Sequence, residues 1–450
     1  MTHNQALQAA LDAWNCCAGL RGKRQRHKSY TYGDQWGDIV VDTDGGFSSE
    51  RDFYAMRNHN PSTDNIIRQL VKTVVGCYRK VHNGSGTDVR AFEEFLISGC
   101  ALQRLSVENR GDGVARWVDN VSPGRFFVNT MMSPSGDDVE VVGQLHDMTF
   151  SRLLLRFSHG EKERIAALRS LYPEGGSSLS GKSLRFGESN SQNLGFRTAP
   201  SSLCRVIEVW TLELSPALLC HDTASGSMFR TPATAEKEVA AENSHRRASA
   251  LPIIDFKHEL LRRWRCRFMT PEGDVLHSSV SNSHPYVFKF YPFIDGEIHS
   301  FVEDLIEQQR NINRLLTLND RILATAAKGV LLFPDEQLSR HMSLDEVADN
   351  FSVPDGIVRY YGKAGVPPPQ QLVTPMGNLG IDRMIERQLK FAADASGVSN
   401  ALRGADILPG MSASMYQAGV DNSLAALADI FDTFKEFIAL RDSRLNSLQS

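Results

Sequence analysis

Residues 283–334 read SHPYVFKFYPFIDGEIHSFVEDLIEQQRNINRLLTLNDRILATAAKGVLLFP, and they contain the clearest helix signal in the sequence. Within 297–327 the apolar residues keep to one face of a helix. They are Ile298, Phe301, Val302, Leu305, Ile306, Ile312, Leu315, Leu316, Ile322 and Leu323. Acidic side chains occupy the early turns, where the helix dipole favours them, and Gly329 and Pro334 come after the end. Such a helix would be roughly 46 Å long, so we expect it to span between layers of the protein.

Upstream of this helix the sequence predicts a mixture of helices and strands. Helical periodicity recurs at 4–20, 63–80, 90–97, 148–157, 161–171 and 234–247. Strand signals recur at 99–111, 113–129, 204–214, 265–280 and 285–294. The tripeptide PEG within 265–280 indicates a hairpin turn. Residues 174–202 are rich in Ser, Gly and Asn with few apolar anchors, so we expect a mobile loop there.

Downstream, the sequence alternates between short strands and helices. Strand-like segments at 329–333 and 356–361 precede a loop, VPPPQQLVTPMGNLG, at 366–380. Helices are predicted at 381–395 and 412–448, the second with apolar residues at near-heptad spacing. A seam of that kind suits helix packing within or between subunits. The whole chain therefore predicts an α+β fold.

The composition limits the number of domains and the ways in which the chain could contact nucleic acid. A length of 450 residues suggests about three domains. With 41% hydrophobic and 23% charged residues and a net charge of −4, the chain has no excess of cations for gripping nucleic acid through a broad basic face. A protein that lets DNA slide past remains compatible with this balance.

The cysteines and the apolar runs indicate where the protein is made. The seven cysteines are scattered and form no CxxC pair, which favours free thiols in a reducing compartment and argues against zinc. No apolar run approaches the ~18 residues of a membrane span, and the N-terminus does not resemble a secretory leader. We expect a cytosolic product, or part of a particle assembled in cytosol, that does not contact a membrane.

One motif suggests an enzyme. Residues 176–183, GSSLSGKS, match the phosphate-binding pattern GxxxxGK[ST], with Lys182 and Ser183 as the phosphate and Mg²⁺ ligands. That pattern requires a buried strand before it and a helix after it, whereas here a charged helix ending at Pro173 precedes it and glycines interrupt the residues after it. We interpret the match as an exposed loop, and a P-loop nucleotide-binding enzyme remains an alternative. HExxH and GxSxG are absent, so we predict no catalytic residue, cofactor or metal.

Several stretches resemble, in order, the portal proteins of tailed bacteriophages. Residues 21–36, RGKRQRHKSYTYGDQW, resemble the family's basic opening and its Y-x-x-GDQW-like signature. Residues 65–76 resemble the family's next helix, N-x-I-x-x-x-V-x-x-x-V-G. The stretch 283–334 resembles the portal stem helix, with Gln-Arg-x-Ile-Asn at 309–313 and the small-residue exit AAKG.

The resemblance covers most of 20–450. Residues 388–404, QLKFAADASGVSNALRG, are similar to the segment that comes after the tunnel loop and re-enters the wing. The chain resembles most the shorter portals of phages of gut Bacteroidales. We therefore expect a short helical crown and no long C-terminal barrel.

The resemblance implies a portal fold with a mixed α/β wing, a long stem helix, a small β-containing clip and a short helical crown. Its implied parts are the wing at 1–205 with the mobile loop 174–202, the clip and stem-proximal region at 206–296, the stem helix at 297–327, the wing return at 328–400 with a tunnel loop at about 366–380, and the crown at 401–450. In the tunnel loop, the uncharged polar residues Gln370, Gln371, Thr374 and Asn378 can contact phosphates weakly without binding them tightly. The candidate residues on the stem helix are Gln309, Arg310 and Asn313.

The function that the resemblance implies is structural. About twelve subunits would form a ring at one capsid vertex, the channel through which double-stranded DNA is packaged and ejected without sequence specificity. The ring would dock the large terminase subunit and then a head-tail adaptor protein, and it would contact the major capsid or scaffolding protein. The protein would be assembled in the host cytoplasm and reside in the virion. A capsid scaffold or adaptor without a channel is the other alternative.

Overall fold

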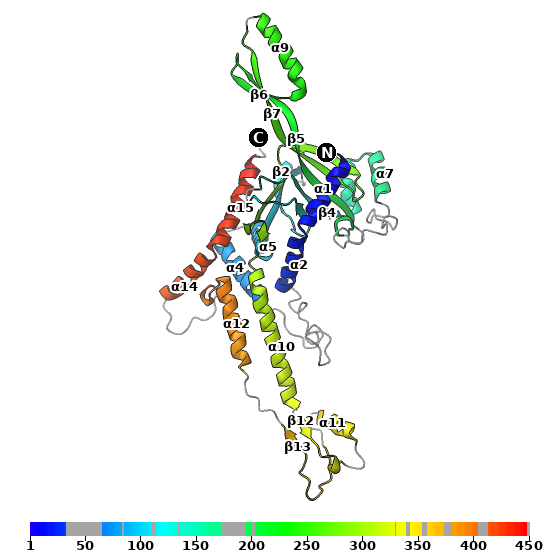
Figure 1. The fold of residues 1–450 in the computed structure, drawn as a ribbon, viewed down its shortest axis with the longest axis vertical. Helices are drawn as coiled ribbons and strands as arrows, with labels where there is room; N and C mark the ends of the chain where they lie inside the picture. Colours follow the sequence, from blue (N-terminus) through cyan, green and yellow to red (C-terminus); the bar gives the residue numbers. More distant parts are fainter. Residues whose placement is uncertain are drawn as a thin grey trace. The chain divides into compact units, whose positions relative to one another are not determined.

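The computed structural model describes thirteen stretches of the chain, and its elements are shown in Figure 1. These stretches are residues 1–32, 65–82, 85–109, 114–133, 136–172, 195–199, 203–249, 251–328, 330–338, 343–352, 358–372, 380–403 and 413–447. The chain divides into two compact units. Unit 1 comprises Met1–Lys28, Val75–Glu303 and Ala428–Ser450, and unit 2 comprises Ser29–Val74 and Asp304–Leu427. Both helices and strands are abundant, so the α+β prediction is confirmed.

Unit 1 is built on an antiparallel six-stranded sheet. Its strands are β3 (Phe126–Val128), β4 (Val141–Met148), β5 (Cys204–Asp222), β6 (Ser227–Pro232), β7 (Ile254–Met269) and β8 (Val275–Ser281). The order is β3-β4-β5-β7-β8, with β6 also pairing with β5. The first residues of β5, CRVIEVWT, are all buried and rich in β-branched and aromatic types that favour strands. At Gly143 a Cβ would lie 2.1 Å from the Glu208 carbonyl oxygen, so only glycine allows β4 and β5 to pair this closely.

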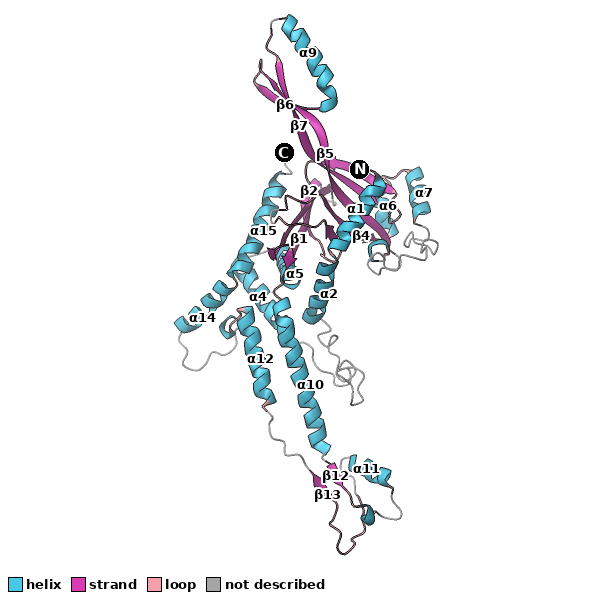
Figure 2. Ribbon diagram, in the orientation of Figure 1, coloured by secondary structure: helices cyan, strands magenta, loops and turns pink. Residues whose placement is uncertain are grey.

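Beyond β4 and β8, β5 and β7 continue as a long ribbon that β6 joins along β5, with α9 (Glu236–Ala248) beside its end (Figure 2). A small apolar cluster of Leu218, Cys220, Val239 and Ile254 fills the space between helix and ribbon. The buried amide of Asn243 adds two hydrogen bonds to the backbone of Ile254, at 2.7 and 2.8 Å. The predicted helix at 234–247 and the hairpin that turns at PEG are both confirmed.

A second sheet of unit 1 has three strands in the order β2-β1-β9. These are β1 (Cys100–Asn109), β2 (Val114–Asn120) and β9 (Tyr286–Phe290), all antiparallel. The pairing of β1 with β2 confirms the two strands predicted within 99–129. A short pair, β10 (Pro292–Ile294) and β11 (Glu297–Ile298), comes after β9.

The helices of unit 1 cover these sheets. They include α1 (His3–Cys16), α5 (Gly86–Ser98), α6 (Phe150–Phe157), α7 (Lys162–Leu171) and α15 (Ala428–Ser447), while α2 (Ala18–Tyr32) and α4 (Ile66–His82) contribute their first and last parts respectively. The apolar seam of α15 packs within the chain. Its Phe434 ring lies 5.0 Å from Phe92, 5.3 Å from Tyr78 and 5.6 Å from Phe95. Edge-to-face contacts of this kind stabilise beyond their buried area.

Unit 2 contains α10 (Ile306–Lys328), α12 (Ile381–Ser396) and smaller elements. The others are β12 (Val330–Leu332), α11 (Leu344–Ser352), β13 (Gln370–Leu372), α13 (Asn400–Arg403) and α14 (Ala413–Ala426). The predicted helix 381–395 and the strand at 329–333 are confirmed. Of the segment predicted as a strand at 356–361, residues 358–361 are described and belong to no strand.

The prediction that the long helix begins at 297 is wrong, because α10 starts at Ile306. Residues 297–302 make backbone hydrogen bonds outside a helix, including His299 N–H to the Tyr291 carbonyl at 3.1 Å and Val302 N–H to the Leu96 carbonyl at 3.3 Å. Tertiary pairing of the backbone thus overrides the helical periodicity. Of the predicted loop 174–202, residues 195–199 are described, and Phe196 is fully buried in the core of unit 1.

A buried carboxylate joins the two sheets of unit 1. Glu208 on β5 is 0% exposed. Arg104 on β1 donates to its Oε1 at 3.4 Å, Trp210 donates to Oε1 at 2.8 Å, and His146 on β4 bonds Oε2 at 2.7 Å. Burial alone would raise the pKa of Glu208, but the charge of Arg104 and these hydrogen bonds outweigh it and hold the pKa well below its usual range.

We expect Glu208→Gln to destabilise the protein by about 1–3 kcal/mol at pH 7, because it removes the buried carboxylate beside Arg104 and leaves this cation, among the described residues, only the longer ion pair with Glu108 at 3.6 Å. Since folding lowers the pKa of Glu208 from 4.5, the carboxylate stabilises the fold at higher pH, and this stabilisation is lost as the pH falls below about 4.5. Urea unfolding at several pH values measures the effect. The difference from wild type should shrink in acid, and a difference that does not change with pH would contradict this role. Glu163→Gln, on the exposed face of α7, is the matched control.

Candidate nucleic-acid interface on the α10–α12 hairpin

The helices α10 and α12 of unit 2 pack against each other as two arms of a hairpin. Just after the C-terminal end of α10, β12 pairs antiparallel with β13, and α11 lies close by (Figure 1). The less exposed side of α12 has helical spacing, with Ile381, Ala392 and Ser396 buried and Ile385 and Gln388 half-buried. This side accounts for the packing, so the opposite side of α12 is exposed.

The exposed side of α12 carries three cations. Arg383, Arg387 and Lys390 are separated by four and three residues, which places them on one helical face. We call these residues the basic stripe. Within the described stretches none of the three forms an ion pair, and the guanidinium of Arg387 lies over the Phe391 ring at 5.6 Å. Three free cations on one face can attract phosphates.

Acidic residues on the same helix limit that attraction. Asp382, Glu386 and Asp394 equal the basic stripe in number, so α12 has no net charge. Binding to DNA weakens with each phosphate contact that is lost or neutralised. The helix therefore suits transient contact with nucleic acid and does not suit tight binding.

The stem candidates Gln309, Arg310 and Asn313 all lie on α10, but two of them face the interior of unit 2. Gln309 and Asn313 are 0% exposed. The Gln309 amide nitrogen donates to the Asn313 side-chain oxygen at 2.8 Å, and its oxygen accepts from the backbone N–H of Ile66 at 2.9 Å. Gln309 therefore satisfies an N–H group in the first turn of α4, which has no partner within its own helix. Arg310 pairs instead with the exposed Glu307 at 2.9 Å.

Of the four tunnel-loop candidates, the structure describes two. Gln370 and Gln371 belong to β13, where they pair with Leu332 and Leu331 of β12. The strand 370–372 thus interrupts the predicted loop 366–380, because the ladder with β12 satisfies its backbone groups. Gln370 is exposed. Thr374 and Asn378 lie outside the described residues, as does the motif at 176–183.

The sequence interpretation missed two features. The basic stripe could have been found, because its spacing of four and three residues is visible in IDRMIERQLK. The burial of Glu208 could not have been inferred with its partners, because Arg104 and His146 come from strands far away in the sequence. The structure otherwise offers little for metal chemistry. In the part of the chain that is described, no cluster of three or more His, Cys, Asp or Glu side chains could bind a metal.

A family model for the phage P22-like portal protein matches residues 79–442. This match covers most of the chain, which therefore belongs to the P22-like phage portal family. Its role is accordingly structural, as a component of the phage particle.

Portal proteins assemble as oligomeric rings and act with the capsid, the terminase and DNA. The resemblance to tailed-phage portals is thus confirmed, and the finer likeness to portals of Bacteroidales phages stays a prediction. No curated protein matches the chain. Among the helices that the structure describes, none combines the length and apolar character needed to cross a membrane.

We expect Gln309→Met to lower stability by about 1–3 kcal/mol, because it leaves the Ile66 N–H and the Asn313 amide buried without their partner. Met has a similar shape, so lost packing contributes little. Glu307→Gln, two residues earlier on the exposed side of α10, is the control and should change stability by less than about 0.5 kcal/mol. Thermal unfolding of the purified variants measures both. Equal unfolding temperatures for Gln309→Met and wild type would show that the amide does not join α10 to α4.

Proposed function

We propose that this chain is the portal subunit that forms a ring at one capsid vertex, with the basic stripe of α12 directed toward the DNA that passes through. The observation that supports this most directly is the family match over 79–442, which includes the whole hairpin. In a ring the subunits repeat the stripe around one axis. The ring, of about twelve subunits by analogy with portal proteins, would be the channel for packaging and ejection.

The charge balance of α12 favours transient contact with DNA that moves past over a stable DNA-binding site. The basic stripe spans the eight residues 383–390, or about 10 Å of helix axis, and duplex DNA carries one charge per about 1.7 Å. Cations at such spacing keep the phosphates close, while Asp382, Glu386 and Asp394 of the same helix prevent firm retention. None of these contacts reads bases, so DNA would pass without sequence specificity.

Two assignments of the clip are compatible with these observations. The resemblance places the clip within 206–296, which the structure shows as the β5–β7 ribbon with α9 and the strands after it. We propose the far end of the hairpin, 330–372, as the second candidate, because β12 and β13 form a small sheet exposed at the end of two long helices. The clip would dock the large terminase subunit and later a head-tail adaptor. The wing would contact the capsid or scaffolding protein, during assembly in the host cytoplasm.

Reversing the charge of the basic stripe tests the channel. We expect Arg383→Glu, Arg387→Glu and Lys390→Glu together to leave ring assembly intact, because all three side chains are exposed. The negative surface would repel the phosphates and lower the fraction of DNA-filled heads by at least about 10-fold. Electron microscopy of particles made in cells that supply the variant subunit measures this fraction.

The control reverses three exposed cations of unit 1 that lie outside both clip candidates, with Lys162→Glu, Arg164→Glu and Arg169→Glu on α7. This control variant should package DNA as wild type does. Normal packaging by the α12 variant would contradict the proposal that α12 faces DNA. An equal loss in both variants would show that net charge alone is responsible.

A further inference from the structure

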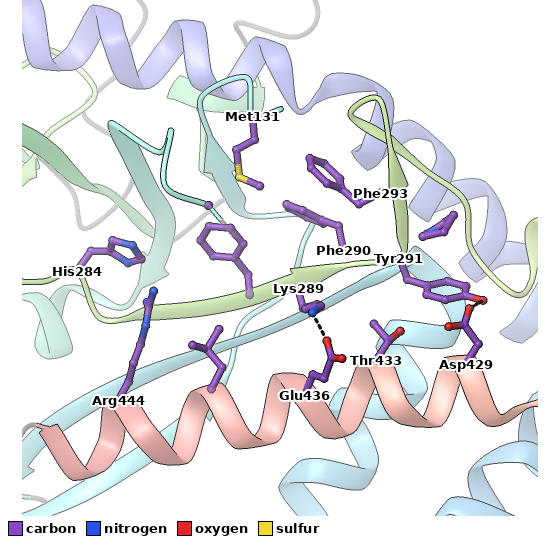
Figure 3. Close-up of a pocket in the computed structure, with 14 residues that line it drawn as sticks. Met131, His284, Lys289, Phe290, Tyr291, Phe293, Asp429, Thr433, Glu436 and Arg444 are labelled. Carbon is purple, nitrogen blue, oxygen red and sulfur yellow. Dashed lines mark hydrogen bonds and ion pairs between the residues drawn. The ribbon is translucent and has the colours of Figure 1, made fainter. Parts of the chain in front are cut away.

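Unit 1 contains an open cavity of about 460 Å³ between α15 and the strands β9 and β10 (Figure 3). Its apolar lining consists of Met131, Phe288, Phe290, Pro292, Phe293 and Leu440. On the side of α15 the lining residues recur every three or four positions, from Asp429 through Thr433 and Glu436 to Arg444. The cavity is thus an aromatic groove with charged groups along one helix.

The charges at one end of the groove are satisfied within the chain. The Tyr291 hydroxyl donates to Asp429 at 2.8 Å, and Lys289 forms an ion pair with Glu436. Figure 3 shows both interactions bridging β9 and α15. A ligand gains little by replacing them, because each partner already has its opposite charge or donor.

The other end of the groove holds a cation without a counter-ion. Arg444 is half-buried and donates to the Tyr286 carbonyl at 2.8 Å, but it forms no ion pair with any described carboxylate. Its guanidinium points toward His284 in Figure 3. Burial lowers the pKa of Arg444, which shows that its charge is poorly compensated.

The imidazole of His284 lies beside Arg444 at this end. It is 9% exposed, and its Nδ1 is buried without a hydrogen-bond partner in the described part of the chain. Burial, with a smaller effect from the charge of Arg444, lowers the pKa of His284 to about 3, so the imidazole is neutral at pH 7. The Trp264 ring packs nearly perpendicular to it, with the ring centroids 4.7 Å apart. His284 therefore forms a neutral wall of the groove and adds no charge to balance that of Arg444.

We propose that this groove binds a segment of a protein partner in which a carboxylate lies next to an aromatic side chain. The carboxylate would pair with Arg444, and the aromatic ring would pack on Phe288 and Phe290. An arginine binds a carboxylate through two parallel hydrogen bonds, which gives both strength and orientation. This inference goes beyond the proposed channel and does not depend on it.

The lining favours a protein segment over nucleic acid. Asp429 lines the same groove with the neutral Tyr291 hydroxyl as its hydrogen-bond partner, so its negative charge would repel a phosphate backbone that runs along the groove. A peptide presents one isolated carboxylate beside apolar side chains, which matches one cation beside an aromatic lining. The ligand class is therefore an acidic, aromatic peptide segment.

The probe is the capped dipeptide acetyl-Phe-Asp-amide, titrated into the full-length chain by isothermal calorimetry. We expect one site per chain with a dissociation constant of about 1 mM or tighter. The isostere acetyl-Phe-Asn-amide lacks the charge and should bind at least about 10-fold more weakly. Arg444→Gln should weaken binding of the Asp peptide by a similar factor, whereas Arg444→Lys, which keeps the charge but loses the paired donors, should give an affinity between those of Arg444→Gln and wild type. Lys435→Gln, on α15 but outside the groove, should bind as wild type does.

Thermal unfolding of each variant separates lost binding from lost folding, and Arg444→Lys preserves the charge if Arg444→Gln does not fold. Equal affinity for the Asp and Asn peptides, or unchanged binding by Arg444→Gln, would overturn the proposal. Binding of free 3-phenylpropionate without binding of the peptide would point to a small metabolite and overturn the protein partner. Binding by the isolated chain but not by the assembled ring would show that a neighbouring copy fills the groove. The state of assembly of the wild type tests the channel separately.

Discussion

A carboxylate that is removed from water is stable only when cations and hydrogen-bond donors surround it, and Glu208 obtains those groups from two sheets of unit 1. Arg104 comes from the three-stranded sheet, and His146 and Trp210 from the six-stranded sheet. The two sheets must therefore meet at this point. Because β9 belongs to the smaller sheet, the same constraint also positions Tyr286 and, through it, the carbonyl to which Arg444 donates.

Unit 2 uses neutral amides for a similar purpose. Gln309 and Asn313 bond to each other and to the first turn of α4, so the inner side of α10 is fixed by hydrogen bonds as well as by apolar contacts. With α12 packed against α10, only its outer side is available to other molecules. In the channel that we propose, this outer side would stay in place while DNA moves past it.

Local patterns in the sequence predicted most of the elements. Periodicity located α12 and the body of α10, and turn residues located the hairpin between β7 and β8. The single helix predicted over 412–448 is two helices, α14 and α15, in the structure. The start of α10 was wrong because residues 297–302 bond to Tyr291 and Leu96, partners that no local pattern reveals. The tunnel-loop candidates were chosen by composition, and composition does not show that Gln370 pairs with β12. The basic stripe could have been predicted, but the groove at Arg444 depends on contacts between distant segments.

Native mass spectrometry of the purified full-length chain tests whether the subunits assemble into a ring. We expect a discrete species of roughly 600 kDa, about twelve times the 50.0 kDa of one chain, with annular end-on views in negative stain. A stable monomer that binds ATP would show that the chain is not a ring-forming portal subunit. It would direct attention instead to the phosphate-binding motif at 176–183 and to Lys182.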